Sequence, residues 1–303
     1  MIAKCGSLAN VRHFGGPYES VLKEMIMSKR AILSTSVILL SLSGLLQAEP
    51  GELHGLVDLV YQSKYIWRGF DVFDGKSAIQ PAVDVDLFET GFGISAMGHR
   101  ANTSGFENEE RWDYTGYYYN RVFENRPYET TFRVSYVYYN FPQLTRKLRD
   151  LQEMNGIFSW PKLFPVKDLV PTYVLARMWP SSKDAVISHE RDLTTGRRSS
   201  GSPSGWFHIF MLDYAFPIKG LVPEIPEHII DLHAELVYND GVGPAGQNVD
   251  QDWSNAVFGI STDIDLGQNF SLTPALYYQM TMEDTVNTDD DETWVSLSLK
   301  YKF

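Results

Sequence analysis

A strict alternation of apolar and polar residues constrains the fold of this chain more than any other feature of its sequence. In Tyr128–Asn140 an extended backbone gathers one set of side chains on a single face: Tyr128, Phe132, Val134, Tyr136 and Tyr138. The opposite face is polar and includes Arg133. The segment Thr293–Phe303 alternates in the same way, with Lys300 on its polar face. Since successive side chains of a strand point to opposite sides, both segments predict strands with one apolar and one polar face.

The same pattern recurs from Glu52 onward, in segments of about ten residues separated by turn residues. We count about twelve such segments, and an even number is typical of single-chain bacterial barrels. They begin near positions 53, 79, 92, 112, 128, 151, 171, 206, 229, 254, 270 and 293. The sequence therefore predicts an all-β fold, a transmembrane antiparallel β-barrel of about twelve strands.

The connections between these segments agree with a barrel whose two termini are periplasmic. Periplasmic turns of such barrels are short and extracellular loops are longer. The expected periplasmic connections are Glu89–Gly91, Glu124–Pro127, Pro161–Val170, Pro217–His228 and Leu266–Asn269. The expected extracellular loops are Tyr65–Ala78, Arg100–Arg111, Pro142–Asp150, Pro180–Gly205, Asn239–Trp253 and Met282–Glu292. Two of the periplasmic connections, in the middle of the chain, are longer than the rule favours.

A secreted soluble β-sandwich is the alternative fold, because its strands also alternate. The chain is 14% aromatic although its mean hydropathy is only −0.22. In a membrane barrel the aromatic residues have a place in the two girdles at the membrane–water interfaces. After the first fifty positions there is no apolar run of about 20 residues, which a membrane-spanning helix would need. These features favour the barrel.

The N-terminal region predicts export. Residues 1–26 form an extension unlike a signal, which is explained if translation begins at Met27 (or Met25) and not at Met1. Residues 27–48 read as a signal peptide cleaved near Ala48. A membrane-anchoring helix is the alternative, but the apolar run Ala31–Leu46 is too short and is diluted by serines. The barrel then comprises residues 49–303. We expect the outer membrane of a Gram-negative bacterium, with outer-membrane lipid and lipopolysaccharide around the barrel.

Strand parity assigns a set of charged side chains to the lumen. A charge on the lipid side costs about 2–4 kcal/mol near the midplane, so these residues should point inward. They are Asp84, Asp86, Arg133, Asp231, His233, Glu235, Asp263, Asp265 and Lys300. Acidic rings select cations, which predicts a narrow, weakly cation-favouring pore for small hydrophilic solutes. The alternative is a plugged lumen in which the carboxylates pair with the bases.

The C-terminal run Ser296–Phe303 looks like the terminal strand that outer-membrane barrels present to their assembly machinery, with Tyr301 and Phe303 as its signal. The segment Ser63–Ala96 resembles the start of the TorF-like putative porins. The matching positions are Tyr65, Trp67, Arg68, Gly69, Asp74, Gly75, Lys76, Gln80, Gly91, Phe92 and Gly93. The resemblance implies an outer-membrane barrel and names no substrate. Trp67, Arg68 and Gly69 in the first loop suit a tight turn at the interface, and either a structural role or a ligand contact fits them.

Other functions have less support in the sequence. The net charge of −12 disfavours nucleic-acid binding, which needs clustered Lys and Arg. No G-x-S-x-G motif is present, and no Ser can be paired with His208 or His233, so we expect no enzyme and no cofactor. The acidic loop Met282–Glu292 is either solvated or a Ca²⁺ site, and the basic loop Pro180–Gly205 is either mobile, folded into the mouth, or bound to lipopolysaccharide phosphates. A non-conducting structural or adhesive barrel and an outer-membrane hydrolase are the alternative functions to a channel.

Overall fold

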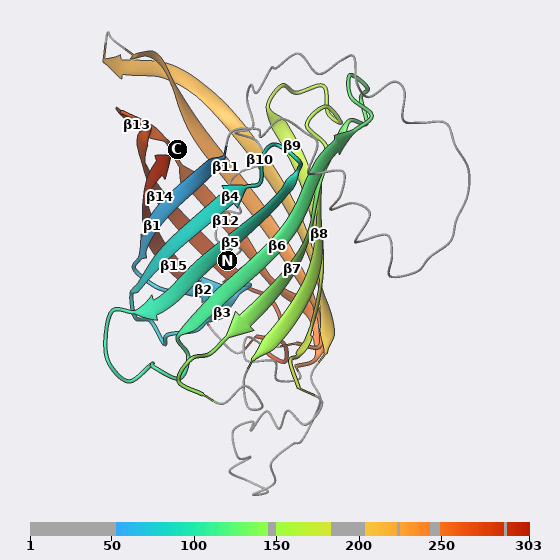
Figure 1. Cartoon of the computed structure of the whole chain (residues 1–303), viewed down its shortest axis with the longest axis vertical. Helices are drawn as coiled ribbons and strands as arrows, with labels where there is room; N and C mark the ends of the chain where they lie inside the picture. Colours follow the sequence, from blue (N-terminus) through green and yellow to red (C-terminus); the bar gives the residue numbers. More distant parts are fainter. Residues whose placement is uncertain (1–52, 145–149, 183–203, 223–224, 243–248, 288–289) are drawn as a thin grey trace, which may run out of the picture.

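The chain forms an antiparallel sheet that closes on itself as a barrel (Figure 1). The computed structural model describes residues 53–144, 150–182, 204–222, 225–242, 249–287 and 290–303. The sheet contains 13 strands; β1 pairs with β15, and β12 pairs directly with β14, so the circuit is complete. The short β13 (Ile264–Gly267) pairs with β14 beside this circuit, which leaves 12 strands in the wall (13 minus β13).

The wall strands agree with the predicted segments one for one. No predicted start differs from the observed one by more than four residues, the largest offset being that of Ile225 against position 229. Their bounds are β1 His54–Gln62, β4 Ala78–Asp86, β5 Phe92–Ala101, β6 Arg111–Val122, β7 Thr130–Asn140, β8 Leu151–Ser159, β9 Leu169–Pro180, β10 Gly205–Val222, β11 Ile225–Asp240, β12 Gln251–Ser261, β14 Phe270–Thr281 and β15 Glu292–Lys302. The prediction of a transmembrane antiparallel barrel of about twelve strands is confirmed.

The two ends of the barrel differ in the length of their connections. The turns after β4, β6, β8, β10 and β12 lie at the end that also holds both described chain ends, where the Gly55 amide donates to the Phe303 carbonyl at 2.9 Å. Left-handed residues tighten several of these turns, including Glu89 (φ 57°), Asn125 (φ 61°) and Asn269 (φ 67°). The longer connections lie at the opposite end. By the rule for such barrels the turn end is periplasmic and the loop end is extracellular.

One predicted turn is wrong. Pro217–His228 is not a loop but part of a two-stranded ribbon, because β10 and β11 stay paired as far as Val222 and Ile225. This ribbon extends past the rim of the barrel (Figure 1, gold). The neighbouring strands end earlier, β9 opposite Tyr214 and β12 opposite Asp231. The Ala215 amide donates to the Asp168 carbonyl on the β9 side. Pro217 lies two residues further along, so its nitrogen, which has no hydrogen to donate, faces the same side, where β9 has already ended.

The outer face of the barrel is apolar, and on strands such as β15 the residues that alternate with it are polar and face inward. Large apolar side chains of β15 such as Leu297 are 43% exposed, whereas the intervening Ser296 and Ser298 are 8% and 7% exposed. This is the reverse of a soluble sandwich, whose apolar face meets a core. The outer surface therefore matches a lipid-facing band, which supports an outer-membrane location. The described residues include no helix long and apolar enough to cross a membrane. The predicted extension, signal peptide and cleavage site lie outside the described residues.

We predict that Leu297→Arg destabilises the folded barrel by about 2–4 kcal/mol, because it puts a charge on the lipid side at the middle of β15. Thr293→Arg is the matched control, since Thr293 also points outward but lies at the end of the same strand, where the cost is about 0–1 kcal/mol. Equilibrium unfolding of both variants in lipid bilayers measures the difference. Equal losses of stability would contradict the lipid-facing assignment of β15.

Candidate functional site

The first extracellular loop folds into the barrel instead of projecting from it. Within this loop, β2 (Ile66–Trp67) and β3 (Phe70–Asp71) pair as a hairpin. We call residues 65–73 the inner hairpin. Its side chains are buried although the loop belongs to no wall strand, with Tyr65 2%, Trp67 4% and Phe73 0% exposed. Residues 65–73 of the predicted extracellular loop Tyr65–Ala78 are therefore an element of the barrel interior, whereas Asp74, Gly75 and Lys76 are exposed.

The turn of the inner hairpin consists of Arg68 and Gly69. Both have positive φ, 50° and 96°, as a two-residue type I′ turn requires. Arg68 is a residue that rarely adopts this conformation, so the surrounding contacts must hold it there. A Cβ on Gly69 would lie 2.2 Å from Asn255 Oδ1, so a larger residue would have to displace the buried Asn255 side chain and also adopt a φ of 96° that favours glycine.

Arg68 forms a buried ion pair with Glu153 of β8. Arg68 Nη2 donates to Glu153 Oε1 at 2.8 Å, and Arg68 Nη1 lies 2.7 Å from Glu153 Oε2. Both side chains are nearly inaccessible, 4% and 0% exposed. Burial by itself lowers the pKa of the Arg68 guanidinium, but the Glu153 carboxylate outweighs burial and the pKa lies above its ordinary value. The guanidinium is therefore charged at any physiological pH.

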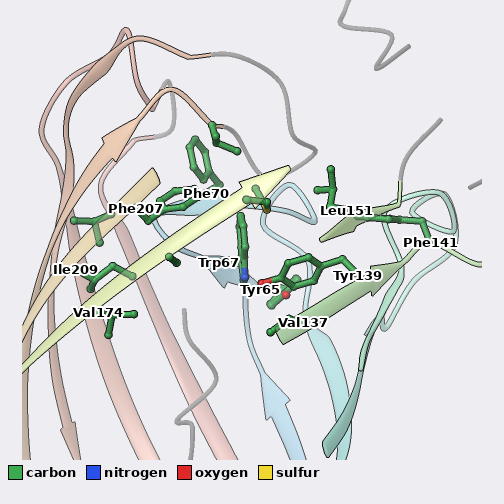
Figure 2. Close-up of a cluster of buried hydrophobic side chains, with 14 of the residues drawn as sticks. Tyr65, Trp67, Phe70, Val137, Tyr139, Phe141, Leu151, Val174, Phe207 and Ile209 are labelled. Atoms are coloured by element: carbon green, nitrogen blue, oxygen red, sulfur yellow. The ribbon is translucent and has the colours of Figure 1, made fainter. Parts of the chain in front are cut away.

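Aromatic rings surround this ion pair. The Arg68 guanidinium carbon lies 4.5 Å from the ring centre of Phe207 and 4.8 Å from that of Trp67. Arg111 of β6 lies over the other rings of the group, 4.9 Å from Trp67 and 4.6 Å from Tyr139. Figure 2 shows Trp67 and Phe70 of the inner hairpin among side chains of several wall strands. Cation–π contacts of this kind are strongest when they are desolvated, as they are here.

A second polar group holds the beginning of the inner hairpin. Tyr65 stacks on His99 of β5 with ring centres 4.9 Å apart, and its hydroxyl accepts a hydrogen bond from Arg111 at 3.0 Å. Arg111 also pairs with Asp113, with Nε 2.7 Å from Oδ1. His99 bridges Asp113 at 2.9 Å and Gln80 at 2.9 Å. The Arg111 charge is thus compensated by Asp113, which leaves Glu153 to Arg68.

The opposite side of the lumen holds the turn by its backbone. The carbonyl oxygen of Gly69 accepts two hydrogen bonds, from Gln279 Nε2 of β14 at 2.6 Å and from Asn287 Nδ2 at 2.7 Å. Asn287 belongs to the acidic loop Met282–Glu292, and it is 0% exposed. Part of that loop is therefore packed against the inner hairpin. No cluster of metal-ligating side chains occurs in the described part of the chain.

The predicted lumen residues lie nearer the periplasmic end, mostly in separate polar groups. Arg133 Nη2 lies 3.6 Å from Asp84 Oδ2, and its guanidinium carbon is 3.7 Å from the Tyr117 ring centre. Lys300 Nζ lies 3.5 Å from Asp263 Oδ1. His233 bridges two carboxylates, Nδ1 to Asp213 Oδ1 at 2.8 Å and Nε2 to Glu235 Oε2 at 3.8 Å.

The other three predicted lumen residues are placed differently from one another. Asp86 accepts a hydrogen bond from the Glu89 amide in the periplasmic turn. Asp231 pairs with Ser261 at the last register position between β11 and β12. Asp265 lies in the exposed β13 and accepts a hydrogen bond from the Gly267 amide at 2.8 Å. Gly267 has a φ of 78° and forms part of the turn after β12. Asp265 therefore lies beside the wall circuit and not in a wall strand.

The remaining sequence candidates divide between the wall surface and the undescribed loops. Tyr301 and Phe303 are exposed on the outer face at the end of β15, 37% and 43%. His208 faces outward on β10 and shares a hydrogen bond of 2.7 Å with the Tyr173 hydroxyl. Most of the basic loop Pro180–Gly205, including the segment 183–203, lies outside the described residues.

Sequence reasoning missed the residues that build the interior. Glu153, Arg111, Tyr139 and Gln279 face inward on their strands, and their strand parity alone could have found them. What parity does not reveal is that the first loop turns into the barrel. A clue was the density of aromatic and small residues around Trp67, because an exposed loop seldom carries so many large apolar side chains.

No protein-family model matches the chain, and no curated protein matches it. Solved structures with a similar fold include an outer-membrane channel from Pseudomonas putida F1 (10% identity, 84% of this chain and 97% of the other, TM-score 0.48). An anion-selective porin from Comamonas acidovorans (10%, 83% and 99%, 0.33) and OccAB3 from Acinetobacter baumannii (11%, 85% and 65%, 0.36) are also similar. At such identities and TM-scores these likenesses carry no information on transport or selectivity.

We predict that Gly69→Ala displaces the inner hairpin, since the added Cβ meets Asn255 and φ 96° disfavours any side chain. Gly75→Ala is the control, because Gly75 also has a positive φ (72°) but its Cβ would lie 4.0 Å from the nearest atom. The chain has one cysteine, Cys5, so Phe70→Cys supplies a single reporter in protein refolded from residues 49–303. Maleimide should label this reporter thiol rapidly when Phe70→Cys is combined with Gly69→Ala, and slowly when Phe70→Cys is alone or combined with Gly75→Ala. Equal protection in all backgrounds would show that the turn tolerates a Cβ.

Proposed function

We propose that the protein is a porin-like outer-membrane channel for small hydrophilic solutes, closed in its extracellular half by the inner hairpin. One observation carries this proposal. The wall closes through main-chain pairing of β1 with β15 and of β12 with β14, and none of these pairs includes the hairpin. The hairpin is held by side-chain contacts and by the carbonyl of Gly69. It can therefore leave the lumen without opening the wall.

The ion pair between Arg68 and Glu153 suits a gate better than it suits a permanent plug. Well-packed apolar residues stabilise an interior as well as a buried ion pair does, because desolvation offsets much of the attraction between the charges. A buried pair makes the closed state depend strongly on both partners, since removal of one leaves the other charged and unpaired. Arg68 also adopts a strained conformation, which lowers the cost of leaving.

The periplasmic half of the lumen supports a preference for cations. By strand parity we assign to it Asp58, Asp84, Asp86, Glu129, Asp213, Asp231, Glu235 and Asp263 against Arg121, Arg133, His233 and Lys300. Several of the carboxylates are paired, and the acids still outnumber the bases. A lumen with surplus carboxylates favours cations in transit.

A non-conducting structural barrel is the second candidate, and the aromatic cluster favours it. Trp67, Phe70 and Phe73 join a continuous apolar core with wall residues such as Phe207 and Val174. Burial of so many large side chains stabilises the closed state. For either function we expect the assembly machinery to recognise the end of β15, where Tyr301 and Phe303 are exposed.

Arg68→Ala should raise the open probability of the channel in planar bilayers. Breaking a buried pair by removing one partner costs about 3–5 kcal/mol, enough to change a two-state equilibrium more than about tenfold. Arg100→Ala is the matched control, since Arg100 forms an ion pair with Glu110 but its side chain is 79% exposed. It should behave as the unsubstituted protein does. Silence of the correctly folded Arg68→Ala barrel would favour the non-conducting alternative.

Cation preference can be measured in the open Arg68→Ala channel under a salt gradient. Replacing Asp84 and Asp213 together with Asn should move the reversal potential toward zero, because both carboxylates are partly exposed in the lumen, each with 36% of its side chain accessible. Asp284→Asn is the control, as Asp284 is exposed in the extracellular loop. A reversal potential unchanged by the double substitution would refute the role of these carboxylates.

A further inference from the structure

We propose that the wall pocket occupied by Arg68 is a binding site for guanidinium-bearing solutes of the arginine type, which open the channel by competing with the inner hairpin. The gating part of this inference rests on the function proposed above. The binding part rests only on the geometry of the pocket. In this view Arg68 and Gly69 are an internal substitute for the solute.

The pocket is built mainly from wall residues that stay in place when the hairpin leaves. Glu153 comes from β8, Tyr139 from β7 and Phe207 from β10. The Tyr139 hydroxyl donates to Glu153 Oε2 at 2.9 Å, and Asn155 Nδ2 donates to Glu153 Oε1 at 2.8 Å. These bonds fix the carboxylate in one orientation whether or not Arg68 is present.

The carboxylate requires a cation. Glu153 is 0% exposed, and a buried charge without a partner is strongly destabilising. Arg111, a second cation in contact with Trp67 and Tyr139, is already paired with Asp113. Departure of Arg68 therefore leaves a site that attracts a positively charged occupant from solution.

The shape of the pocket selects a guanidinium over an ammonium group. Two nitrogens of Arg68 face the two carboxylate oxygens at 2.8 Å and 2.7 Å, an arrangement that a planar fork can match and a single point charge cannot. The Phe207 ring lies against the guanidinium, with its centre 4.5 Å from the central carbon. Stacking on an aromatic face is likewise favoured by a flat, weakly hydrated cation.

A second anchor recognises an acceptor oxygen near the guanidinium. Gln279 and Asn287 both donate to the carbonyl of Gly69, one residue beyond Arg68. Two amide donors that converge on one oxygen also suit a carboxylate oxygen. An occupant with a guanidinium at one end and a carboxylate at the other reproduces both sets of contacts, and arginine and the dipeptide Arg-Gly have these groups.

Competition with the hairpin is feasible because the hairpin binds at a disadvantage. Arg68 must hold φ at 50°, whereas a free solute meets no such backbone restriction. The hairpin has the advantage of being tethered, since the Ser63 amide donates to the Val295 carbonyl at 2.9 Å just before it begins. The balance between the two makes opening depend on solute concentration.

Isothermal titration calorimetry of the refolded mature protein with L-arginine tests the site. Removal of the internal competitor in Arg68→Ala should tighten L-arginine binding by about tenfold or more relative to the unsubstituted protein. L-citrulline, which has the same shape but no charge, should not bind. Arg100→Ala should bind like the unsubstituted protein. The double variant Arg68→Ala/Glu153→Gln, which leaves no unpaired buried charge, should fold by the criterion of heat-modifiable gel mobility and lose binding.

Bilayer recordings separate the site from the gate. L-arginine on either side should raise the open probability of the unsubstituted channel, and L-citrulline should not. Binding to Arg68→Ala without any opening would overturn the solute-driven gate and leave the binding site established. Absence of L-arginine binding to a folded Arg68→Ala protein, or binding that survives Glu153→Gln, would overturn the inference even if the channel conducts.

Discussion

Main-chain hydrogen bonding is the constraint on which the rest of this structure depends. In a hydrocarbon layer an unpaired backbone amide or carbonyl finds no water for a hydrogen bond, so a sheet can cross the membrane only when it has no edge. Here β1 meets β15 and β12 meets β14, and every wall strand has two neighbours. The one ribbon that lacks outer neighbours, the end of β10 and β11, lies beyond the rim of the barrel.

Because the wall is closed by its backbone, its side chains are free to serve the two environments separately. The outward set is large and apolar, and the inward set is mixed, with polar and charged residues beside a buried apolar group that includes Phe207 and Val174. A barrel of twelve strands is intermediate in width. Side chains fill the lumen of smaller barrels, and the lumen of large porins stays open. In this barrel the extracellular half is filled by a loop that carries its own aromatic residues. The result is a core inside the barrel that a soluble protein would place between two sheets.

The core contains a buried ion pair, so its stability depends on two particular residues and not on apolar packing alone. Arg68 and Glu153 are held by a fork of short contacts and surrounded by rings, and neither is stable there without the other. The ion pairs nearer the periplasmic end, such as Arg133 with Asp84 and Lys300 with Asp263, are more exposed and therefore weaker. The interior thus passes from a tightly coupled site near the extracellular mouth to an acidic, wetter vestibule.

The amino-acid sequence by itself determined the wall. Period-two alternation fixes which face of each strand meets lipid, and turn residues fix where strands end, so all the wall strands were predictable. The extension of the β10–β11 ribbon was not, because Pro217 reads as a breaker unless the missing neighbour strand is known. Only the tertiary structure decided what fills the lumen. The contacts of Arg68 with Glu153 and of Gly69 with Gln279 join residues far apart in the chain, so strand parity does not show which wall residues an inward-turning loop meets.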